Sequence, residues 1–409
     1  MARRRVDHLI IGGGLAAGNC ARWLREEGGE GSILLVGREP DPPYNRPPLS
    51  KGYLQGKESR EDALFRPDEW WVEQKIEHLQ RTSVMKLDTA ERVATLSTKE
   101  EIEFGNALIA TGANVKRLRV AGCDLDGIHY LRAFANSEAI RADAETRKRA
   151  VLIGGSYIGC EVAASLTAAH GVDCTIVMME DVTFGPFFGA KVGRYFQDVL
   201  EEHGVKVHGG EELERFEGDG DRVTRVVTKS GLELDCDFVV VGIGVTPDVT
   251  LARAAGLEIG DAGGVRCSAG LESSVDGIFA AGDICEYDSP IHGRPIRIEH
   301  WDVAFNQGKT AALNMLGRGV EHDVVPYFFS DLADWSSMEY VGPGSGEPVV
   351  RGSIEEHDFT AFYLDDGSVK AAMTVGRSDD LEHARRFLTE HIKVDPAALA
   401  DEGTDLASL

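Results

Sequence analysis

Two glycine-rich segments of this chain have the composition and spacing that hold the phosphates of a dinucleotide. The first is Gly-Gly-Gly-Leu-Ala-Ala-Gly at residues 12–18, and the second is Gly-Gly-Ser-Tyr-Ile-Gly at residues 154–159. Such loops let the backbone approach a pyrophosphate, and the following helix points free amides and its positive dipole end at the charge. One match to G-x-G-x-x-G is weak evidence, whereas two in one chain are much stronger. The expected contacts are Gly12, Gly14, Leu15, Ala16 and Ala17 in the first loop, and Gly154, Ser156, Tyr157, Ile158 and Gly159 in the second.

The flanks of the first loop predict a strand, a helix and a second strand. Residues 8–11 are an apolar run, residues 15–23 have apolar side chains at helical spacing, and residues 32–36 are apolar again. In such a unit an acid after the second strand binds the ribose hydroxyls. The chain has Arg38 there, followed by Glu39. We therefore expect Glu39 to bind the ribose.

The second loop has similar flanks, and its second strand is predicted at residues 174–177. Ser156 replaces the middle glycine, and its side chain narrows the approach to the phosphates. Residues 178–185 contain no Arg or Lys to hold a 2′-phosphate, while Glu180 would repel one and accept from a free ribose. NADH is thus favoured over NADPH. The alternative is that Glu180 only ends an exposed strand.

Length and charge limit the class of protein. At 409 residues the chain has room for about three domains. The formal net charge of -25 argues against nucleic acid and anionic membranes as partners. No apolar stretch is long enough to span a bilayer, and the apolar residues after the basic start are expected to be the first strand rather than a signal peptide. We expect a cytoplasmic protein, monomeric or dimeric.

The spacing of the cysteines indicates neither a redox site nor a metal site. None forms a C-x-x-C or similarly close pair, which argues against a reactive disulfide and against a zinc or iron–sulfur site. Most lie in apolar segments and are expected to be inert core thiols. They are Cys20, Cys123, Cys160, Cys174, Cys236, Cys267 and Cys285.

Four further segments carry a family resemblance. They are Pro-Tyr-Asn-Arg-Pro-Pro-Leu-Ser-Lys at 43–51, Ala-Thr-Gly-Ala at 110–113, Gly-Ile-Gly-Val-Thr-Pro at 242–247 and Phe-Ala-Ala-Gly-Asp-Ile at 279–284. With the two loops, they make the chain resemble the oxygenase-coupled ferredoxin reductases of the pyridine nucleotide-disulfide oxidoreductase superfamily. It is also similar to rubredoxin reductases, monodehydroascorbate reductases and apoptosis-inducing factors.

The resemblance implies an α/β fold with two Rossmann-like dinucleotide-binding domains, for FAD and NAD, and a C-terminal α+β domain. The FAD domain is expected over residues 1–116 and 241–322, the NAD domain over 117–240, and the C-terminal domain over 323–409. In the last, Asp-Asp-Gly at 365–367 predicts a hairpin turn. The tail from Ala397 onward is expected to be loosely packed.

Roles for individual residues follow from the same resemblance. Arg46 is expected at the FAD pyrophosphate, Lys51 beside the flavin near N5, and Asp283 on the ribityl chain. Thr111 and Gly112 complete this FAD set, and Gly242 is assigned to NAD. Without the resemblance, the proline-rich segment around Arg46 would be a rigid linker, and Asp283 a turn residue.

Glu161 stands among apolar residues of the predicted second helix, so its charge needs a partner there. We expect that partner to be Lys51, and the resemblance implies a Lys–Glu pair that positions the nicotinamide. The alternative is a solvated helix acid. Tyr157 is expected to shield the flavin face and to yield when nicotinamide stacks.

The remaining candidates surround the other end of the flavin. His300 and Trp301 begin a predicted helix whose positive end would face the pyrimidine side of the ring. Phe329 stands where the resembling ferredoxin reductases usually carry Trp. It keeps an apolar wall but lacks the indole donor.

These inferences predict an NADH-dependent flavoprotein. Residues 37–56 contain no cysteine to receive electrons, so the electrons must leave the protein, and the resemblance implies a small 2Fe–2S ferredoxin as the acceptor. Arg385 and Arg386 could dock such a partner, although a mixed-charge exposed helix face is the simpler interpretation. Two rival functions remain: a reductase of a small oxidant such as a quinone, dye or radical, and a slowly reduced FAD-containing sensor.

Overall fold

The computed structural model describes residues 3–409, which form two compact units. The first unit contains the described part of residues 1–45, with 61–114 and 245–326. The second contains residues 46–60, 115–244 and 327–409. Residues 1 and 2 of the predicted FAD domain lie outside the described part. The three-domain division itself stays a prediction.

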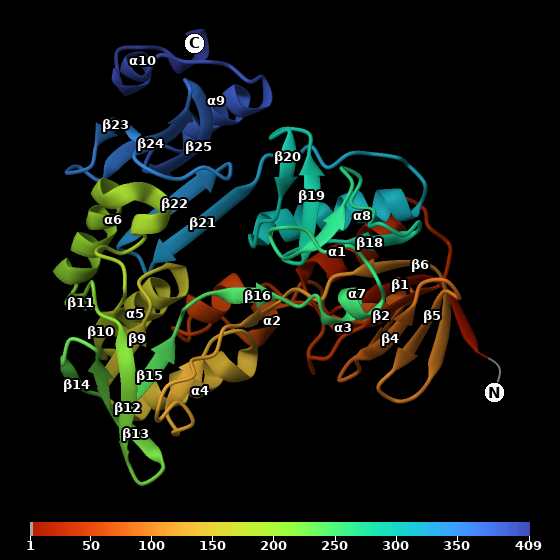
Figure 1. Ribbon diagram of the computed structural model, residues 1–409, viewed down its shortest axis with the longest axis horizontal. Coiled ribbons are helices and arrows are strands. Elements are labelled where there is room, and N and C mark those ends of the chain that lie inside the picture. Colours follow the sequence, from red (N-terminus) through yellow and green to blue (C-terminus); the bar gives the residue numbers. More distant parts are fainter. Residues whose placement is uncertain (1–2) are drawn as a thin grey trace. The chain divides into compact units, whose positions relative to one another are not determined.

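The first unit is built on a seven-stranded sheet of order β3-β2-β1-β6-β5-β4, with β18 paired to β6 (Figure 1). All four residues of β2 are buried, which is typical of a central parallel strand. The strands are β1 Arg4–Ile11, β2 Ile33–Val36, β3 Ile76–Leu79, β4 Val84–Asp88, β5 Val93–Leu96, β6 Glu101–Ile109 and β18 Ile278–Ala280. The strand, helix and strand expected around the first loop are therefore present.

Helices α1 (Leu15–Glu26) and α8 (Trp301–Met315) pack against each other in this unit. Their approach is close at Gly308, where an added Cβ would lie 2.6 Å from the carbonyl oxygen of Ala16. The unit also contains α2 Arg60–Ala63 at its boundary, α3 Asp68–Glu73, α7 Thr250–Ala254, the pair β7 Ala113–Val115 and β16 Val245–Pro247, and the sheet of β17 Val265–Cys267, β19 Cys285–Ser289 and β20 Arg294–Ile296.

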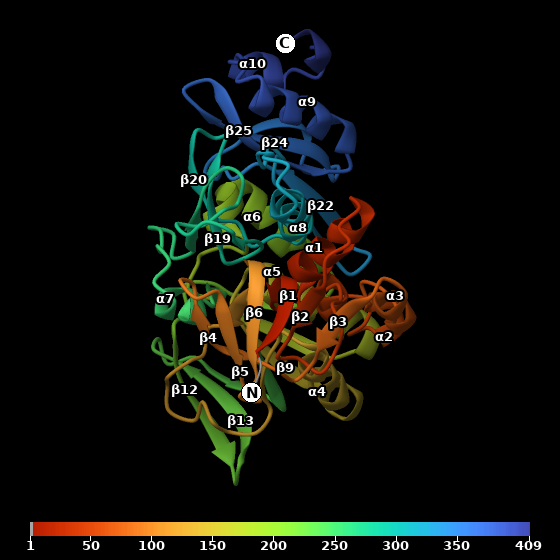
Figure 2. The same ribbon diagram turned by 90° about the vertical axis from the view of Figure 1, so that its right-hand side faces the viewer.

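The second unit contains a five-stranded parallel sheet of order β11-β10-β9-β15-β8. A smaller antiparallel sheet, β12-β13-β14, belongs to the same unit, and its strands β12 and β13 are labelled in Figure 2. The strands are β8 Ile128–Tyr130, β9 Arg149–Ile153, β10 Asp173–Val177, β11 Lys206–His208, β12 Leu213–Asp219, β13 Arg222–Thr228, β14 Glu233–Asp235 and β15 Phe238–Val241. The helical elements are η1 Pro47–Ser50, α4 Phe134–Thr146, α5 Tyr157–His170 and α6 Gly185–Glu202.

The C-terminal part of this unit is an antiparallel sheet of order β21-β22-β25-β24-β23 with the α-helices α9 and α10 and the 3-10 helix η2. The predicted hairpin is present, because β24 and β25 pair directly across the Asp-Asp-Gly turn. The elements are β21 Tyr327–Leu332, β22 Ser336–Val341, β23 Val349–Ser353, β24 Asp358–Asp365, β25 Ser368–Val375, α9 Ser378–Thr389, α10 Pro396–Ala400 and η2 Leu406–Ser408.

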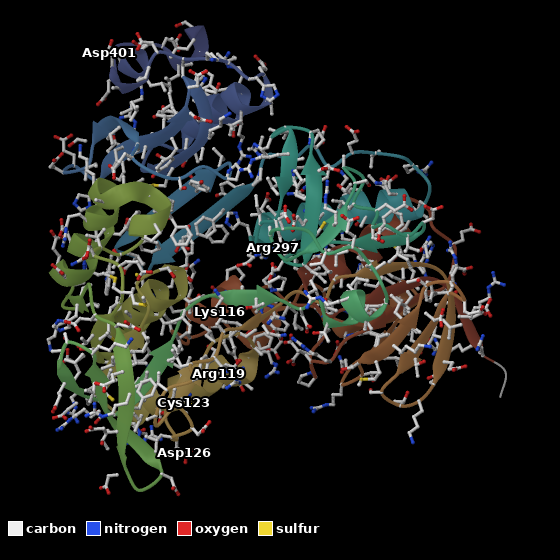
Figure 3. The ribbon with its side chains drawn as sticks, viewed as in Figure 1. Lys116, Arg119, Cys123, Asp126, Arg297 and Asp401 are labelled. Atoms are coloured by element: carbon white, nitrogen blue, oxygen red, sulfur yellow. The ribbon has the colours of Figure 1, made fainter. Side chains whose placement is uncertain are left out.

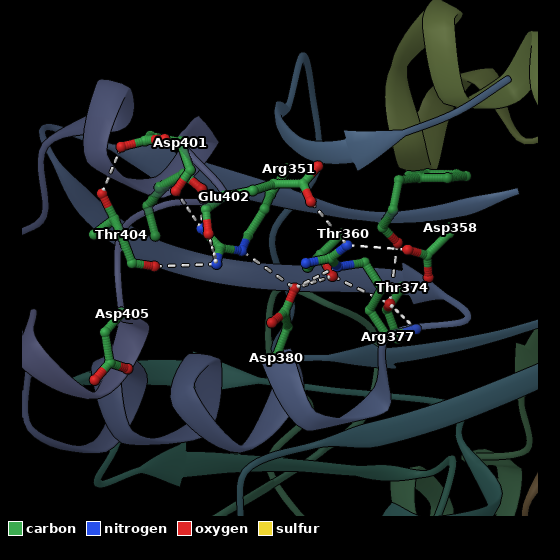
Figure 4. Close-up of polar contacts among 12 residues, drawn as sticks. Arg351, Asp358, Thr360, Thr374, Arg377, Asp380, Asp401, Glu402, Thr404 and Asp405 are labelled. Carbon is green, nitrogen blue, oxygen red and sulfur yellow. Dashed lines mark hydrogen bonds and ion pairs between the residues drawn. The ribbon is translucent and has the colours of Figure 1, made fainter. Parts of the chain in front are cut away.

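The expectation of a loosely packed tail is wrong. Leu399 and Leu406 are buried, and the buried guanidinium of Arg351 donates hydrogen bonds to the carbonyl oxygens of Asp401 at 2.6 Å and Thr404 at 3.1 Å (Figure 4). These bonds satisfy tail carbonyls that would otherwise need water. Within residues 3–409, we find no helix with the length and apolarity needed to cross a bilayer.

Candidate active site

The first glycine loop meets the requirements of a pyrophosphate site. Gly12 has φ +135°, and a Cβ there would lie 2.1 Å from the carbonyl oxygen of Ala110, so only glycine fits. At Gly14 an added Cβ would meet nothing within 4 Å, so the backbone faces open space. Leu15, Ala16 and Ala17 begin α1, whose first turn contains no acid. An anion can therefore bind the free amides of this helix.

The side chains of Arg38 and Glu39 have different polar partners. The Arg38 guanidinium contacts the Asp248 carboxylate at 2.9 Å and donates to Asn114 Oδ1 at 2.6 Å. Glu39 accepts a hydrogen bond from the Tyr44 hydroxyl at 2.6 Å. The positive charge beside the predicted ribose position is thus balanced by Asp248, a partner too distant in sequence for the motif to reveal. The ribose role of Glu39 stays a prediction.

The backbone around Asp283 is fixed from both sides. Gly282 has φ +80°, and its N–H donates to Gln307 Oε1 at 2.8 Å. Arg297, which is labelled in Figure 3, donates to the carbonyl oxygen of Asp283 at 3.0 Å. Asp283 lies three residues after the end of β18, and its role on the ribityl chain stays a prediction.

Thr111 and Gly112 are joined to the segment that follows β16. The Thr111 hydroxyl donates to the carbonyl oxygen of Asp248 at 2.8 Å, and the carbonyl of Gly112 accepts from the Asp248 N–H at 2.8 Å. Gly112 has φ +68°, a conformation that favours glycine. Asp248 therefore connects Thr111, Gly112 and Arg38.

His300 is the residue that precedes the first turn of α8, as the sequence indicated. Trp301 Nε1 donates to Asn45 Oδ1 at 2.9 Å, and the indole stacks on Phe305 with ring centroids 5.3 Å apart. The Trp301 side chain thus has packing and hydrogen-bonding partners within the first unit. Contact of either residue with flavin stays a prediction.

The second loop also meets the steric requirements of a dinucleotide site. A Cβ at Gly154 would lie 2.4 Å from the carbonyl oxygen of Gly242, and one at Gly159 would lie 2.0 Å from that of Gly154. Ser156 precedes α5 with φ −112° and ψ −162°, an extended conformation like that of Gly14, with φ −90° and ψ −173°. Serine therefore brings no backbone strain here, and its hydroxyl does not cap the helix.

Lys51 and Glu161 form the ion pair expected from the sequence. Lys51 Nζ lies 3.1 Å from Glu161 Oε1, and the two side chains are 13% and 6% exposed. Lys51 follows the short helix η1, whereas Glu161 lies in the second turn of α5. A buried carboxylate needs such partners, because loss of water is otherwise unfavourable.

Three residues that the sequence analysis missed complete this cluster. The hydroxyls of Ser50 and Ser330 each donate to the Glu161 carboxylate at 2.5 Å, one to each oxygen. Asp331 Oδ2 lies 3.6 Å from Lys51 Nζ. Ser330 and Asp331 come from β21, so only the tertiary fold brings them to Glu161. In the sequence, only the predicted Lys51–Glu161 pair indicated a polar cluster at this place.

The position of Lys51 is defined by its surroundings. The carbonyls of Leu49 and Ser50 accept from the hydroxyls of Ser137 at 2.8 Å and Ser165 at 2.7 Å. Lys51 Nζ also lies 4.6 Å from the centroid of the Phe329 ring, within the range of a cation–π interaction.

Arg46, at the start of the same segment, donates to the carbonyl oxygen of Arg132. Its predicted role at the FAD pyrophosphate is not tested by this contact. The segment is not extended throughout, since Pro47–Ser50 forms a 3-10 helix.

Tyr157 is packed against other aromatic rings. Its ring centroid is 4.5 Å from that of Phe328, 5.3 Å from Phe184 and 5.2 Å from Phe187. Burial raises the pKa of its hydroxyl well above the usual value. The tyrosine therefore stays protonated at neutral pH, and its ring is available for stacking rather than for acid–base chemistry.

All seven cysteines are free thiols, and six are buried. Cys123, labelled in Figure 3, is the partly exposed one. Burial raises the pKa of Cys174 to about 12 and that of Cys285 well above its usual value. Cys267 interacts with Cys285 across neighbouring strands, a proximity that sequence spacing did not reveal. Thiolates are the reactive form, so these buried groups are unsuited to electron transfer.

Comparison with known proteins now identifies the family. The family described as pyridine nucleotide-disulphide oxidoreductase matches residues 6–308. This chain belongs to that family. A second family, described as reductase C-terminal, matches residues 327–409.

Two relatives are similar to this chain over almost its whole length. Putidaredoxin reductase CamA of Pseudomonas putida is 32% identical over 412 residues, covering 98% of this chain and 96% of that protein. The ferredoxin--NAD(+) reductase component of the anthranilate 1,2-dioxygenase system of Burkholderia cepacia is 33% identical over 401 residues, covering 96% of each.

A solved structure confirms the fold class expected from the sequence. The ferredoxin reductase for the CYP199A2 system from Rhodopseudomonas palustris matches with a TM-score of 0.93 and 33% identity, covering 98% of this chain and 99% of that one. The covalent putidaredoxin reductase–putidaredoxin complex matches with a TM-score of 0.92 and 31% identity, covering 100% and 98%.

Proposed function

We propose that this protein is an FAD-dependent NADH oxidoreductase that delivers electrons to a small 2Fe–2S ferredoxin. The observation that carries this proposal is the buried Lys51–Glu161 pair, which belongs to the same unit as the second glycine loop. The names of the relatives support the acceptor, since one is a ferredoxin--NAD(+) reductase component and one solved complex joins a reductase to putidaredoxin.

FAD is the expected resident cofactor. The open amides after Gly14 would hold its pyrophosphate, Glu39 its ribose, and Asp283 its ribityl chain. When bound, FAD accepts a hydride equivalent from NADH and returns electrons one at a time. The chain must therefore bind both molecules, orient them and exclude side reactions.

NADH would bind at the second loop. Its pyrophosphate would meet the first turn of α5, and Glu180, which is exposed just beyond β10, would accept from the adenosine ribose. Residues 178–185 offer no cation to a 2′-phosphate. This composition favours NADH over NADPH.

The Lys51–Glu161 pair would set the electrostatics at the flavin. Glu161 is held by two hydroxyl donors, so its carboxylate keeps one position and fixes Lys51 Nζ. Lys51 places a positive charge where the resemblance puts the flavin, and Asp331 moderates that charge. Orientation rather than proton transfer is the contribution of these groups.

Electrons would leave this protein directly from the cofactor. The segment 37–56 has no cysteine, and burial raises the pKa of the Cys160 and Cys285 thiols. An external one-electron acceptor suits that arrangement. Because NADH and ferredoxins occur together in the cytoplasm, we propose that the protein works there.

Anaerobic mixing of the FAD-loaded protein with one equivalent of NADH tests the proposal. We expect the flavin absorbance band to bleach, and added 2Fe–2S ferredoxin, with putidaredoxin as the first probe, to become reduced. If the band does not bleach, the oxidoreductase function is wrong. If it bleaches and only dyes or quinones are reduced by a panel of acceptors, the protein is a reductase of small oxidants.

A further inference from the structure

Exposed apolar side chains gather in the segment that follows β10. Among the residues that the structure describes, four large apolar side chains are exposed, and two of them, Met179 at 68% and Phe187 at 41%, belong to this segment. The other two, Val72 and Met85, lie in the first unit. An exposed aromatic ring next to a dinucleotide loop suggests a ligand-contact role.

The segment is held against the second glycine loop by its backbone. The N–H of Phe184 donates to the carbonyl oxygen of Gly155 at 2.9 Å. Phe184 has φ +55°, which is unfavourable for a bulky residue and persists only where the surroundings enforce it.

The far end of the segment is anchored as well. Gly189 has φ +79°, and a Cβ there would lie 2.7 Å from the carbonyl oxygen of Gly346. Ala190 N–H donates to Glu347 at 3.3 Å. Phe187 is thus presented between two anchored points rather than on a free loop.

The ring of Phe187 contacts Tyr157, with centroids 5.2 Å apart and planes inclined by 45°. Tyr157 is the first residue of α5, and Glu161 follows one turn later on the same helix. Phe187 therefore lies beside the start of the helix that carries Glu161, the partner of Lys51.

We propose that Phe187 contacts the nicotinamide ring of NADH. The inference rests on the proposed use of NADH. With the pyrophosphate at the start of α5 and the adenosine ribose at Glu180, the other half of the dinucleotide extends past Tyr157. Phe187 then supplies an apolar wall beside that tyrosine and limits the orientations of the nicotinamide.

The test compares two ligands that differ only in the nicotinamide ring. In the FAD-loaded protein, Phe187→Ala should weaken NAD⁺ binding by about three- to tenfold, the usual range for one aromatic contact. Binding of ADP-ribose, which lacks nicotinamide, should stay unchanged. Phe187→Tyr should restore NAD⁺ binding. Met85→Ala, an exposed apolar residue of β4, serves as the matched control and should alter neither ligand.

Titration calorimetry gives both dissociation constants, and the flavin absorbance spectrum reports folding. If Phe187→Ala does not fold, Phe187→Leu removes the aromatic face with less loss of volume and decides the question. Equal weakening of NAD⁺ and ADP-ribose, or weakening of neither, overturns the inference. If the unmodified protein binds neither NAD⁺ nor NADH, the proposed function itself fails, so the two failures are distinguishable.

Discussion

Ser330 donates a hydrogen bond to Glu161 at 2.5 Å, on the same carboxylate oxygen that lies 3.1 Å from Lys51 Nζ. Strand β21 of the C-terminal sheet thereby fixes an acid on the helix that follows the second glycine loop. The carboxylate is buried with both oxygens occupied. Removal of Glu161 would therefore leave Lys51 with Asp331 as its charged partner, and that carboxylate is more exposed.

The first prediction concerns stability. Glu161→Ala should lower the free energy of unfolding by about 3–5 kcal/mol, because it leaves a largely buried ammonium group underpaired. Urea denaturation of the FAD-loaded protein measures this change. The matched control is Glu101→Ala, which breaks the Arg3–Glu101 pair at 2.9 Å, with side chains 46% and 47% exposed. Its effect should be about 0–1 kcal/mol; equal losses would show that the buried pair has no special role.

The second prediction separates the two carboxylates that face Lys51. Glu161→Gln keeps the shape but removes the charge that positions Lys51, and one serine hydroxyl must accept from the new amide instead of donating. Flavin reduction by NADH should therefore slow by about 10- to 100-fold. Asp331→Asn removes a carboxylate that is 32% exposed and 3.6 Å away, and should slow it by at most about fivefold. Stopped-flow absorbance under anaerobic conditions measures both rates. A larger effect of Asp331→Asn would reassign the main partner of Lys51.

Contacts and motifs were predictable from the sequence where they are local or follow a familiar pattern, and not where the partners lie far apart in the chain. The glycine loops, their flanking strands and the Lys51–Glu161 pair were predictable, because each motif is local or belongs to a familiar pattern. Ser330 and Asp248 were not, since β21 and the segment after β16 reach their partners only through tertiary folding.

The C-terminal tail shows the same limit. Its terminal position suggested loose packing, yet Leu399 and Leu406 are buried. The deciding residue is Arg351, whose guanidinium donates to tail carbonyls from β23. An isolated arginine in a strand gives no sequence signal of such a role.

The third prediction concerns nucleotide choice. Glu180→Ala should raise KM for NADH by about tenfold, the effect of losing a charged hydrogen bond to the ribose. The same change should improve NADPH relative to NADH, because it removes a repulsive charge. Steady-state reduction of a ferredoxin or dye with each nucleotide measures the ratio. An unchanged KM for NADH would exclude Glu180 from the site.

The fourth prediction concerns the tail. Arg351 also lies 3.7 Å from Asp380, which contacts Arg377 at 3.2 Å (Figure 4). Arg351 and Asp380, with His383 and residues 402–406, line a hollow of about 330 Å³. Arg351→Met should release the tail, since its carbonyls lose their buried donor.

Limited proteolysis followed by mass spectrometry should then detect cleavage within residues 395–409 that the unmodified protein resists. Lys393→Ala is the control, because it removes an exposed pair with Asp366 at 2.6 Å and should leave the tail protected. Resistance of Arg351→Met to cleavage would show that the buried leucines alone hold the tail.

The fifth prediction is a pH dependence of stability. Burial lowers the pKa of His322 to about 4, and its Nδ1 lies 3.0 Å from the Thr310 hydroxyl. The unfolded chain, with an ordinary pKa near 6.5, binds a proton more readily than the folded one. The contribution of neutral His322 to the free energy of unfolding is therefore fully present above pH 6.5. It is lost as the pH falls toward 4, by roughly 3 kcal/mol in all.

His322→Asn removes the titrating group and retains an amide that can face Thr310. The free energy of unfolding should then fall less steeply between pH 6.5 and 4, with a residual slope from His78, whose pKa burial also lowers to about 4. Chemical denaturation at several pH values measures the slope. If His322→Asn keeps the original slope, protonation of His322 does not oppose folding.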